Sequence, residues 1–111
     1  MAPEVIREQY YTEKIDMWSL GITVIEMMDR VPPHYLIKDE MELFSTVLTE
    51  PSPTFTYSYP TMYMRGLVAW LLDEAPQTRP TAKDVLSVFY FLCNMPMQTV
   101  CPHQQSKLKN R

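Results

Sequence analysis

The sequence predicts an all-α fold, with one central buried helix, about three helices packed around it, and no sheet. The 111 residues, 46% of them hydrophobic, are enough for the core of one domain and too few for two. Residues 16–28 would spread apolar side chains over more than half of a helix circumference, so this helix must run through a core. Later segments combine apolar residues at helical spacing with capping residues at their starts, which predicts the surrounding helices.

The segment before the central helix is expected to hold a short helix and a loop. Pro3 suits the first turn of a helix, because its missing N–H would have no partner there. Residues 7–14 are polar and predict a loop, in which we expect Tyr10 and Tyr11 to pack against the central helix rather than to be phosphorylation sites. Asp16 is the expected N-cap of the central helix, since its carboxylate can accept hydrogen bonds from the N–H groups of the first turn.

The next helix is predicted after Pro32 and Pro33, which end the central helix because proline cannot continue it. Asp39 and Glu42 have the spacing of a capping box variant at its start. The apolar residues that follow repeat at i, i+1, i+4 and i+5 and predict one buried face, formed by Leu43, Phe44, Val47 and Leu48. A loop rich in Ser, Thr, Tyr and Pro then extends to residue 60.

Two further helices complete the predicted fold. Residues 61–72 are expected to form one of them, with Trp70 as a large anchor. Thr81 begins a capping box that predicts the start of the last helix. The β-branched and aromatic content of residues 85–93 would also fit a strand, but the cap before them favours a helix. Prolines and scattered polar residues in 94–111 predict an irregular tail.

Three short motifs resemble protein kinases in their order and spacing. The first matches the A-P-E triplet that closes the kinase activation segment, and the second matches the D-x-W-S-L-G that opens the central helix of the large C-terminal lobe. The third resembles the R-P-T-A-x-x-x-L at the start of the last kinase helix. The resemblance covers residues 1–93 and implies part of a protein kinase C-lobe, followed by the tail. The motifs are carried by Ala2, Pro3, Glu4, Asp16, Trp18, Gly21 and Arg79.

The resemblance also implies a kinase branch and an ion pair. Residues 18–29, with the prolines that follow, resemble the Ste20 group of serine/threonine kinases and, within it, the p21-activated kinases. In protein kinases the A-P-E glutamate pairs with the arginine of the third motif, so Glu4 and Arg79 are expected to form a buried ion pair; the alternative is that both face water. Kinases usually have glycine where Arg30 stands, which implies a strained or differently shaped exit from the helix. They commonly have His-Pro at residues 88–89, where this sequence has Val-Phe.

The groups that carry out phosphoryl transfer are missing from the sequence. Kinases use a glycine-rich loop, a strand lysine, an H-R-D catalytic loop and a D-F-G metal aspartate. None of these motifs occurs, and Gly21 and Gly66 are too few and too far apart for a glycine-rich loop. We therefore expect a non-catalytic, pseudokinase-like chain without catalytic, cofactor-binding or metal-binding residues. ATP and Mg²⁺ are expected only for a full-length member of the family.

Composition limits the compartment and the ligands. The net charge of −3 argues against nucleic-acid binding. No apolar run has the length of a membrane span and no signal-peptide pattern is present, so a cytoplasmic protein without membrane attachment is expected. Cys93, Cys101 and His103 lack a fourth ligand at a recognised zinc spacing, so the cysteines are expected to be reduced thiols.

Three functions remain open at this level. The chain can be a non-catalytic kinase fragment or isoform that binds the protein partners of a full-length kinase, through exposed lobe surface or the helix and loop at 39–60. It can be the incomplete sequence of an active Ste20-type kinase whose N-terminal part carries ATP binding and catalysis, or an expressed remnant without selected function. We expect self-association or chaperone binding, because part of the central helix would be uncovered. Its apolar arc consists of Met17, Trp18, Leu20, Ile22, Val24 and Ile25.

Overall fold

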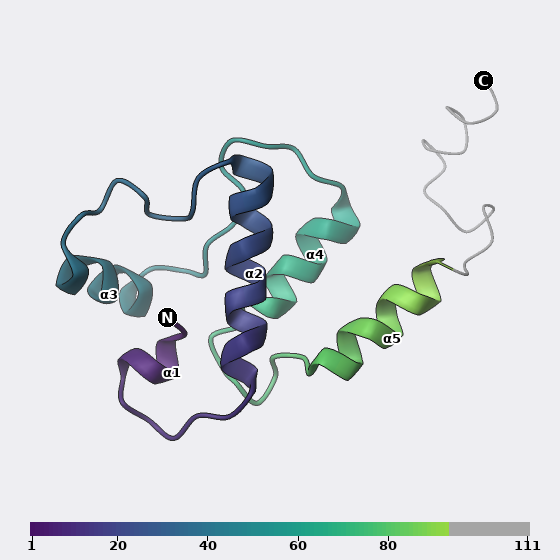
Figure 1. The fold of residues 1–111 in the computed structure, drawn as a ribbon, viewed down its shortest axis with the longest axis horizontal. Helices are drawn as coiled ribbons and strands as arrows, with labels where there is room; N and C mark the ends of the chain where they lie inside the picture. Colours follow the sequence, from purple (N-terminus) through teal and green to yellow (C-terminus); the bar gives the residue numbers. More distant parts are fainter. Residues whose placement is uncertain (94–111) are drawn as a thin grey trace. The chain divides into compact units, whose positions relative to one another are not determined.

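The computed structural model describes residues 1–93, which form five helices and no strand (Figure 1). The all-α prediction is therefore confirmed for these residues. Within the same range, no helix combines the length and the hydropathy needed to cross a membrane. The predicted tail, with Cys101 and His103, lies outside the described residues. The helices are α1 (Pro3–Ile6), α2 (Lys14–Asp29), α3 (Glu40–Thr49), α4 (Met62–Leu71) and α5 (Ala82–Cys93).

The chain divides into two compact units, residues 1–81 and 82–111. The first unit contains α1 to α4, and the second begins with α5. Helix α5 starts directly after Thr81, where the capping box predicted it, so the helical reading of residues 85–93 is confirmed over the strand. The domain boundary after residue 93 stays a prediction.

Helix α2 is the central element of the first unit (Figure 1). Helix α4 packs against α2, and α1 packs against α3. One face of α2 is buried in the core of the unit, whereas Leu20 and Met27 on other faces are exposed. The apolar arc of α2 is therefore covered in part and open in part. The buried apolar core consists of Ala2, Met17, Trp18, Ile25, Phe55, Val68, Leu71 and Leu72.

The predicted N-cap role of Asp16 is wrong. Helix α2 begins two residues earlier, at Lys14, with Glu13 as its N-cap and no side-chain capping bond. The N–H groups of Ile15 and Asp16 donate instead to the backbone carbonyls of Thr12 and Glu13, at 3.2 and 3.0 Å. These carbonyls satisfy N–H groups that a capping side chain would otherwise serve. Asp16 lies exposed in the first turn, where its negative charge still interacts favourably with the helix dipole.

The prediction that Tyr10 and Tyr11 pack against the central helix is also wrong. Their exposed fractions are 92% and 56%. The chain leaves α1 through Glu8, which has a positive φ of 57°, and crosses the surface before it enters α2. The two rings lie on a surface loop and not in the core, because the path of this loop is not encoded by the residue types in it.

Helix α3 is only partly buried. Asp39 occupies the N-cap position as predicted, but its side chain makes no capping hydrogen bond. The predicted apolar face of α3 is half-buried, and none of its residues is fully buried, because α1 is a short partner of four residues. In α4 the cap is complete, since the Thr61 hydroxyl accepts from the N–H of Met64 at 3.2 Å.

Helix α2 ends in a left-handed conformation at a residue that is not glycine. Arg30 is the C-cap, with φ 69° and ψ 2°, and its N–H donates to the carbonyl of Glu26 at 2.8 Å. Glycine adopts this conformation without steric cost, whereas a residue with a Cβ atom does so at a cost of roughly 1–2 kcal/mol. The strained exit predicted at Arg30 is confirmed.

The two glycines of the chain provide a matched test of how closely α2 and α4 pack. A Cβ atom on Gly21 would lie 2.7 Å from Cδ2 of Leu72 and 3.1 Å from Cβ of Leu71, whereas one on Gly66 would meet nothing within 4 Å. We expect Gly21→Ala to lower the free energy of unfolding by roughly 1–3 kcal/mol through overpacking. Gly66→Ala should raise it by up to about 1 kcal/mol through helix propensity.

Urea denaturation of the two variants measures both effects. A gain of stability in Gly21→Ala would show that α2 and α4 do not approach each other as closely as the structure has them. Gly66→Ala serves as the control for the intrinsic effect of adding a methyl group to a helical glycine.

Candidate functional site

The predicted ion pair between Glu4 and Arg79 is formed. Nη1 of Arg79 donates to Oε2 of Glu4 at 2.7 Å, and Nη2 donates to Oε1 at 3.1 Å. This two-point arrangement matches the planar guanidinium to the planar carboxylate. The exposed fractions of the two residues are 2% and 1%, so the pair is removed from water. The alternative that both side chains face solvent is excluded.

The remaining donors of Arg79 are satisfied by backbone carbonyls. Nε and Nη2 both donate to the carbonyl of Asp73, at 3.0 and 2.9 Å, and Nη1 donates to the carbonyl of Lys14 at 3.0 Å. The guanidinium carbon lies 5.3 Å from the centre of the Trp18 ring, which adds a cation–π contact. No buried side-chain nitrogen or oxygen in residues 1–93 lacks a hydrogen-bond partner.

Lys14 completes the cluster, a role that no sequence pattern indicates. Its Nζ donates to the carbonyl of Arg79 at 2.6 Å and to that of Pro76 at 3.2 Å. Arg79 donates to the backbone of Lys14 in return, so each residue holds the main chain of the other. The start of α2 is thereby fixed to the segment that precedes α5. A lysine in a polar stretch offers no sequence signal for such a contact.

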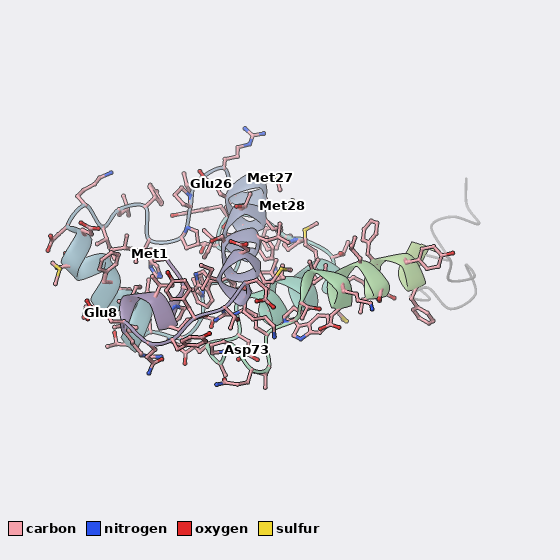
Figure 2. All side chains as sticks on the ribbon, turned by 60° about the horizontal axis from the view of Figure 1, so that its bottom comes forward. Met1, Glu8, Glu26, Met27, Met28 and Asp73 are labelled. Carbon is pink, nitrogen blue, oxygen red and sulfur yellow. The ribbon has the colours of Figure 1, made fainter. Side chains whose placement is uncertain are left out.

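The loop after α4 gives Arg79 its position. The carboxylate of Asp73 accepts from the N–H of Ala75 at 3.1 Å and from the hydroxyl of Thr78 at 2.6 Å, which closes the loop on itself. The indole N–H of Trp70 donates to the carbonyl of Thr78 at 3.3 Å, so this predicted anchor holds the loop rather than filling the core. Figure 2 shows Asp73 in this loop, at the lower edge of the view.

The environment of Glu4 favours its charged form. Burial acts to raise the pKa of Glu4, but the hydrogen bonds and the charge of Arg79 outweigh it and hold the pKa below its usual value. A carboxylate that is ionised, paired and buried cannot exchange protons with a substrate. The cluster therefore acts as a structural tie between α1, α2 and the loop after α4.

The structure brings most of the predicted motif residues to this tie. Ala2 and Pro3 are buried beside Glu4, and Trp18 covers Arg79. Gly21 lies one helical turn further along α2, against α4, while Asp16 points to solvent. Within residues 1–93, no group of three His, Cys, Asp or Glu side chains is close enough together to hold a metal ion.

Comparison with known proteins identifies the family. The protein kinase domain matches residues 1–91, the range that contains the ion pair and all five helices apart from the last two residues of α5. The chain belongs to the protein kinase domain family. Within this kinase domain, the Glu4–Arg79 pair joins the first matched helix to the segment before the last one.

Relatives of the chain are serine/threonine kinases of the Ste20 group, which confirms the predicted group. Serine/threonine-protein kinase TAO2 of Xenopus laevis is 40% identical over 103 residues, and kinase dst1 of Dictyostelium discoideum is 37% identical over 98. These matches cover 90% and 87% of this chain, but 10% and 13% of the relatives. Human serine/threonine-protein kinase 10 is 36% identical over 91 residues, covering 78% of this chain and 9% of that kinase. The chain thus spans about a tenth of these relatives, and the narrower likeness to p21-activated kinases stays a prediction.

The ion pair can be tested by a double-mutant cycle. Glu4→Gln and Arg79→Met each leave one buried charge without its partner, so each should lower the free energy of unfolding by roughly 3–5 kcal/mol. The double variant should lose less than the sum of the two, because neither charge then remains. Glu40→Gln, which removes an exposed carboxylate, is the control and should change stability by less than about 0.5 kcal/mol. Strictly additive losses in urea denaturation would mean that the two side chains are independent.

The pair also predicts a pH dependence of stability. Because the folded-state pKa of Glu4 is lowered, its contribution is fully present above the unfolded-state pKa and is lost as the pH falls through the folded value. The melting temperature of the wild-type chain should therefore fall more steeply than that of Glu4→Gln from about pH 5 downward. Parallel melting curves of the two proteins at pH 7 and in acid would contradict the lowered pKa.

Proposed function

We propose that this chain is a non-catalytic binding module, built on the helical half of a Ste20-type kinase C-lobe. The observation that carries the proposal is the intact Glu4–Arg79 tie in a sequence without any phosphate-binding or catalytic motif. The tie holds α1, α2 and the loop after α4 together, while the sequence lacks the groups that carry out phosphoryl transfer. The proposal places this module in the cytoplasm, without a cofactor.

Exposed apolar side chains supply the binding surface in this proposal. Met27 and Met28 lie at the C-terminal end of α2 and are exposed there (Figure 2). Met41 on α3 and Tyr59 in the following loop add exposed apolar surface in the 39–60 region. Exposed apolar side chains of this kind favour contacts with other proteins, and they also favour self-association or chaperone binding when no partner is present. The module would compete for protein partners of a full-length kinase.

Calorimetric titration with Mg-ATP tests the non-catalytic part of the proposal. We expect no saturable binding in the micromolar to low-millimolar range typical of enzyme substrates, because the sequence has no phosphate-binding loop or metal aspartate. A serine/threonine kinase with complete catalytic motifs is the positive control. Saturable binding, or phosphate transfer to a basic protein that persists through purification, would overturn the proposal.

A second candidate function is that of a structural part of an active kinase. It is favoured by the short coverage of the relatives, of which the chain spans about a tenth. Sequencing the transcript upstream of the Met1 codon tests this candidate. In-frame codons for an H-R-D loop and a D-F-G motif would establish it and replace the binding-module proposal.

A further inference from the structure

A cavity lies at the C-terminal end of α2, at the opposite end of this helix from the ion pair. Its volume is about 270 Å³, and its walls come from the last turn of α2, residues 31–36 and residues 53–57. Figure 1 shows the chain returning from α3 to this end of α2 before it enters α4. A space of this size can hold a side chain of a partner.

Asp29 gives this cavity a negative charge. Its Oδ2 accepts from the N–H of Thr56 at 2.8 Å, and its Oδ1 accepts a short hydrogen bond from the hydroxyl of Ser58. Burial acts to raise the pKa of Asp29, but the hydrogen bonds from Ser58 and from the backbone outweigh it and lower the pKa. The carboxylate is therefore ionised at neutral pH, and neutral donors of residues 56–58 hold it in place.

No lysine or arginine of the described chain balances this charge. Within residues 1–93, Asp29 forms no ion pair, and neither Arg30 nor Lys38 lines the cavity. The contrast with Glu4 is direct, since that carboxylate faces a guanidinium at 2.7 Å.

Two aromatic rings stand beside this carboxylate. Tyr35 and Tyr57 both line the cavity, with ring centres 6.4 Å apart and ring planes at 68°. Both side chains are exposed. The face of a tyrosine ring attracts cations, and the guanidinium of arginine stacks on such a face while it donates to carboxylates. Prolines of the same wall offer apolar contact for the methylene stem of an arginine.

We infer that this cavity binds an arginine side chain of a protein partner, with its guanidinium between the Asp29 carboxylate and the rings of Tyr35 and Tyr57. The inference rests on the proposed binding function and names the chemistry of the partner. It follows from charge complementarity, because the cavity combines a carboxylate without an ion pair, two tyrosine rings and the imidazole of His34, and has no lysine or arginine in its lining. An arginine side chain also fits a volume of about 270 Å³.

A pair of short peptides tests the inference on the full chain. The probe is acetyl-Gly-Arg-Gly-amide, and its partner carries citrulline, which has the shape of arginine without the charge. NMR titration should shift the amide signals of Thr56 and Ser58, and the arginine peptide should bind about fivefold more tightly, the ratio that ~1 kcal/mol of cation–π attraction gives. Equal binding of both peptides, or shifts confined to other regions, would overturn the inference.

Variants locate the binding to this cavity. Asp29→Asn keeps the size of the side chain and should abolish the preference for arginine, whereas Glu40→Gln removes an equal charge on exposed α3 and should leave the preference unchanged. Tyr57→Leu should weaken the arginine peptide, while Tyr59→Leu, outside the cavity, should not. If a variant fails to fold, the two peptides on the wild-type chain still decide the question.

The Mg-ATP titration separates this inference from the proposed function. A chain that binds no ATP and shows no preference for arginine would overturn the arginine site alone. A chain that binds ATP would overturn the non-catalytic proposal, and the peptide comparison would still report on the cavity.

Discussion

Glu4 and Arg79 are brought together from positions 75 residues apart, and neither charge retains contact with water. Moving such charges out of water costs several kcal/mol each. This cost is offset only when both charges are present and every donor has an acceptor. The carbonyls of Lys14 and Asp73 and the ring of Trp18 meet this requirement. Helix α1 has four residues and cannot persist by itself, so the pair also explains why it is ordered.

The carboxylates at the two ends of α2 lie in different environments. At the start of the helix, the carboxylate of Glu4 faces an arginine of the same chain and is closed to solvent. At its end, the carboxylate of Asp29 is held by neutral donors and opens into a cavity. The first arrangement contributes to stability, and the second leaves an attraction for cations unsatisfied. One rigid helix therefore carries both a structural tie and a candidate recognition site.

The proposed binding function fits this distribution of groups. The charges in the tie are fixed and buried, while exposed aromatic and apolar side chains lie on several elements, among them the end of α2, the 39–60 region and α5. Such surfaces recognise a partner by packing and charge, which requires no chemistry on a substrate. The match to the protein kinase domain over residues 1–91 places these features in the helical part of a kinase lobe.

The sequence by itself determined the helices, because periodicity and proline are local signals, and it indicated the kinase family through the order and spacing of its motifs. The Glu4–Arg79 pair was expected only through the resemblance to that family. The sequence also indicated the strained exit at Arg30, which follows from the absence of glycine there. It misplaced the N-cap at Asp16 and the packing of Tyr10, because both depend on which backbone groups and surfaces lie nearby in space. Only the tertiary structure decided the role of Lys14 and the cavity at Asp29, since their partners are 27 to 65 residues away in the chain and no local pattern encodes such contacts.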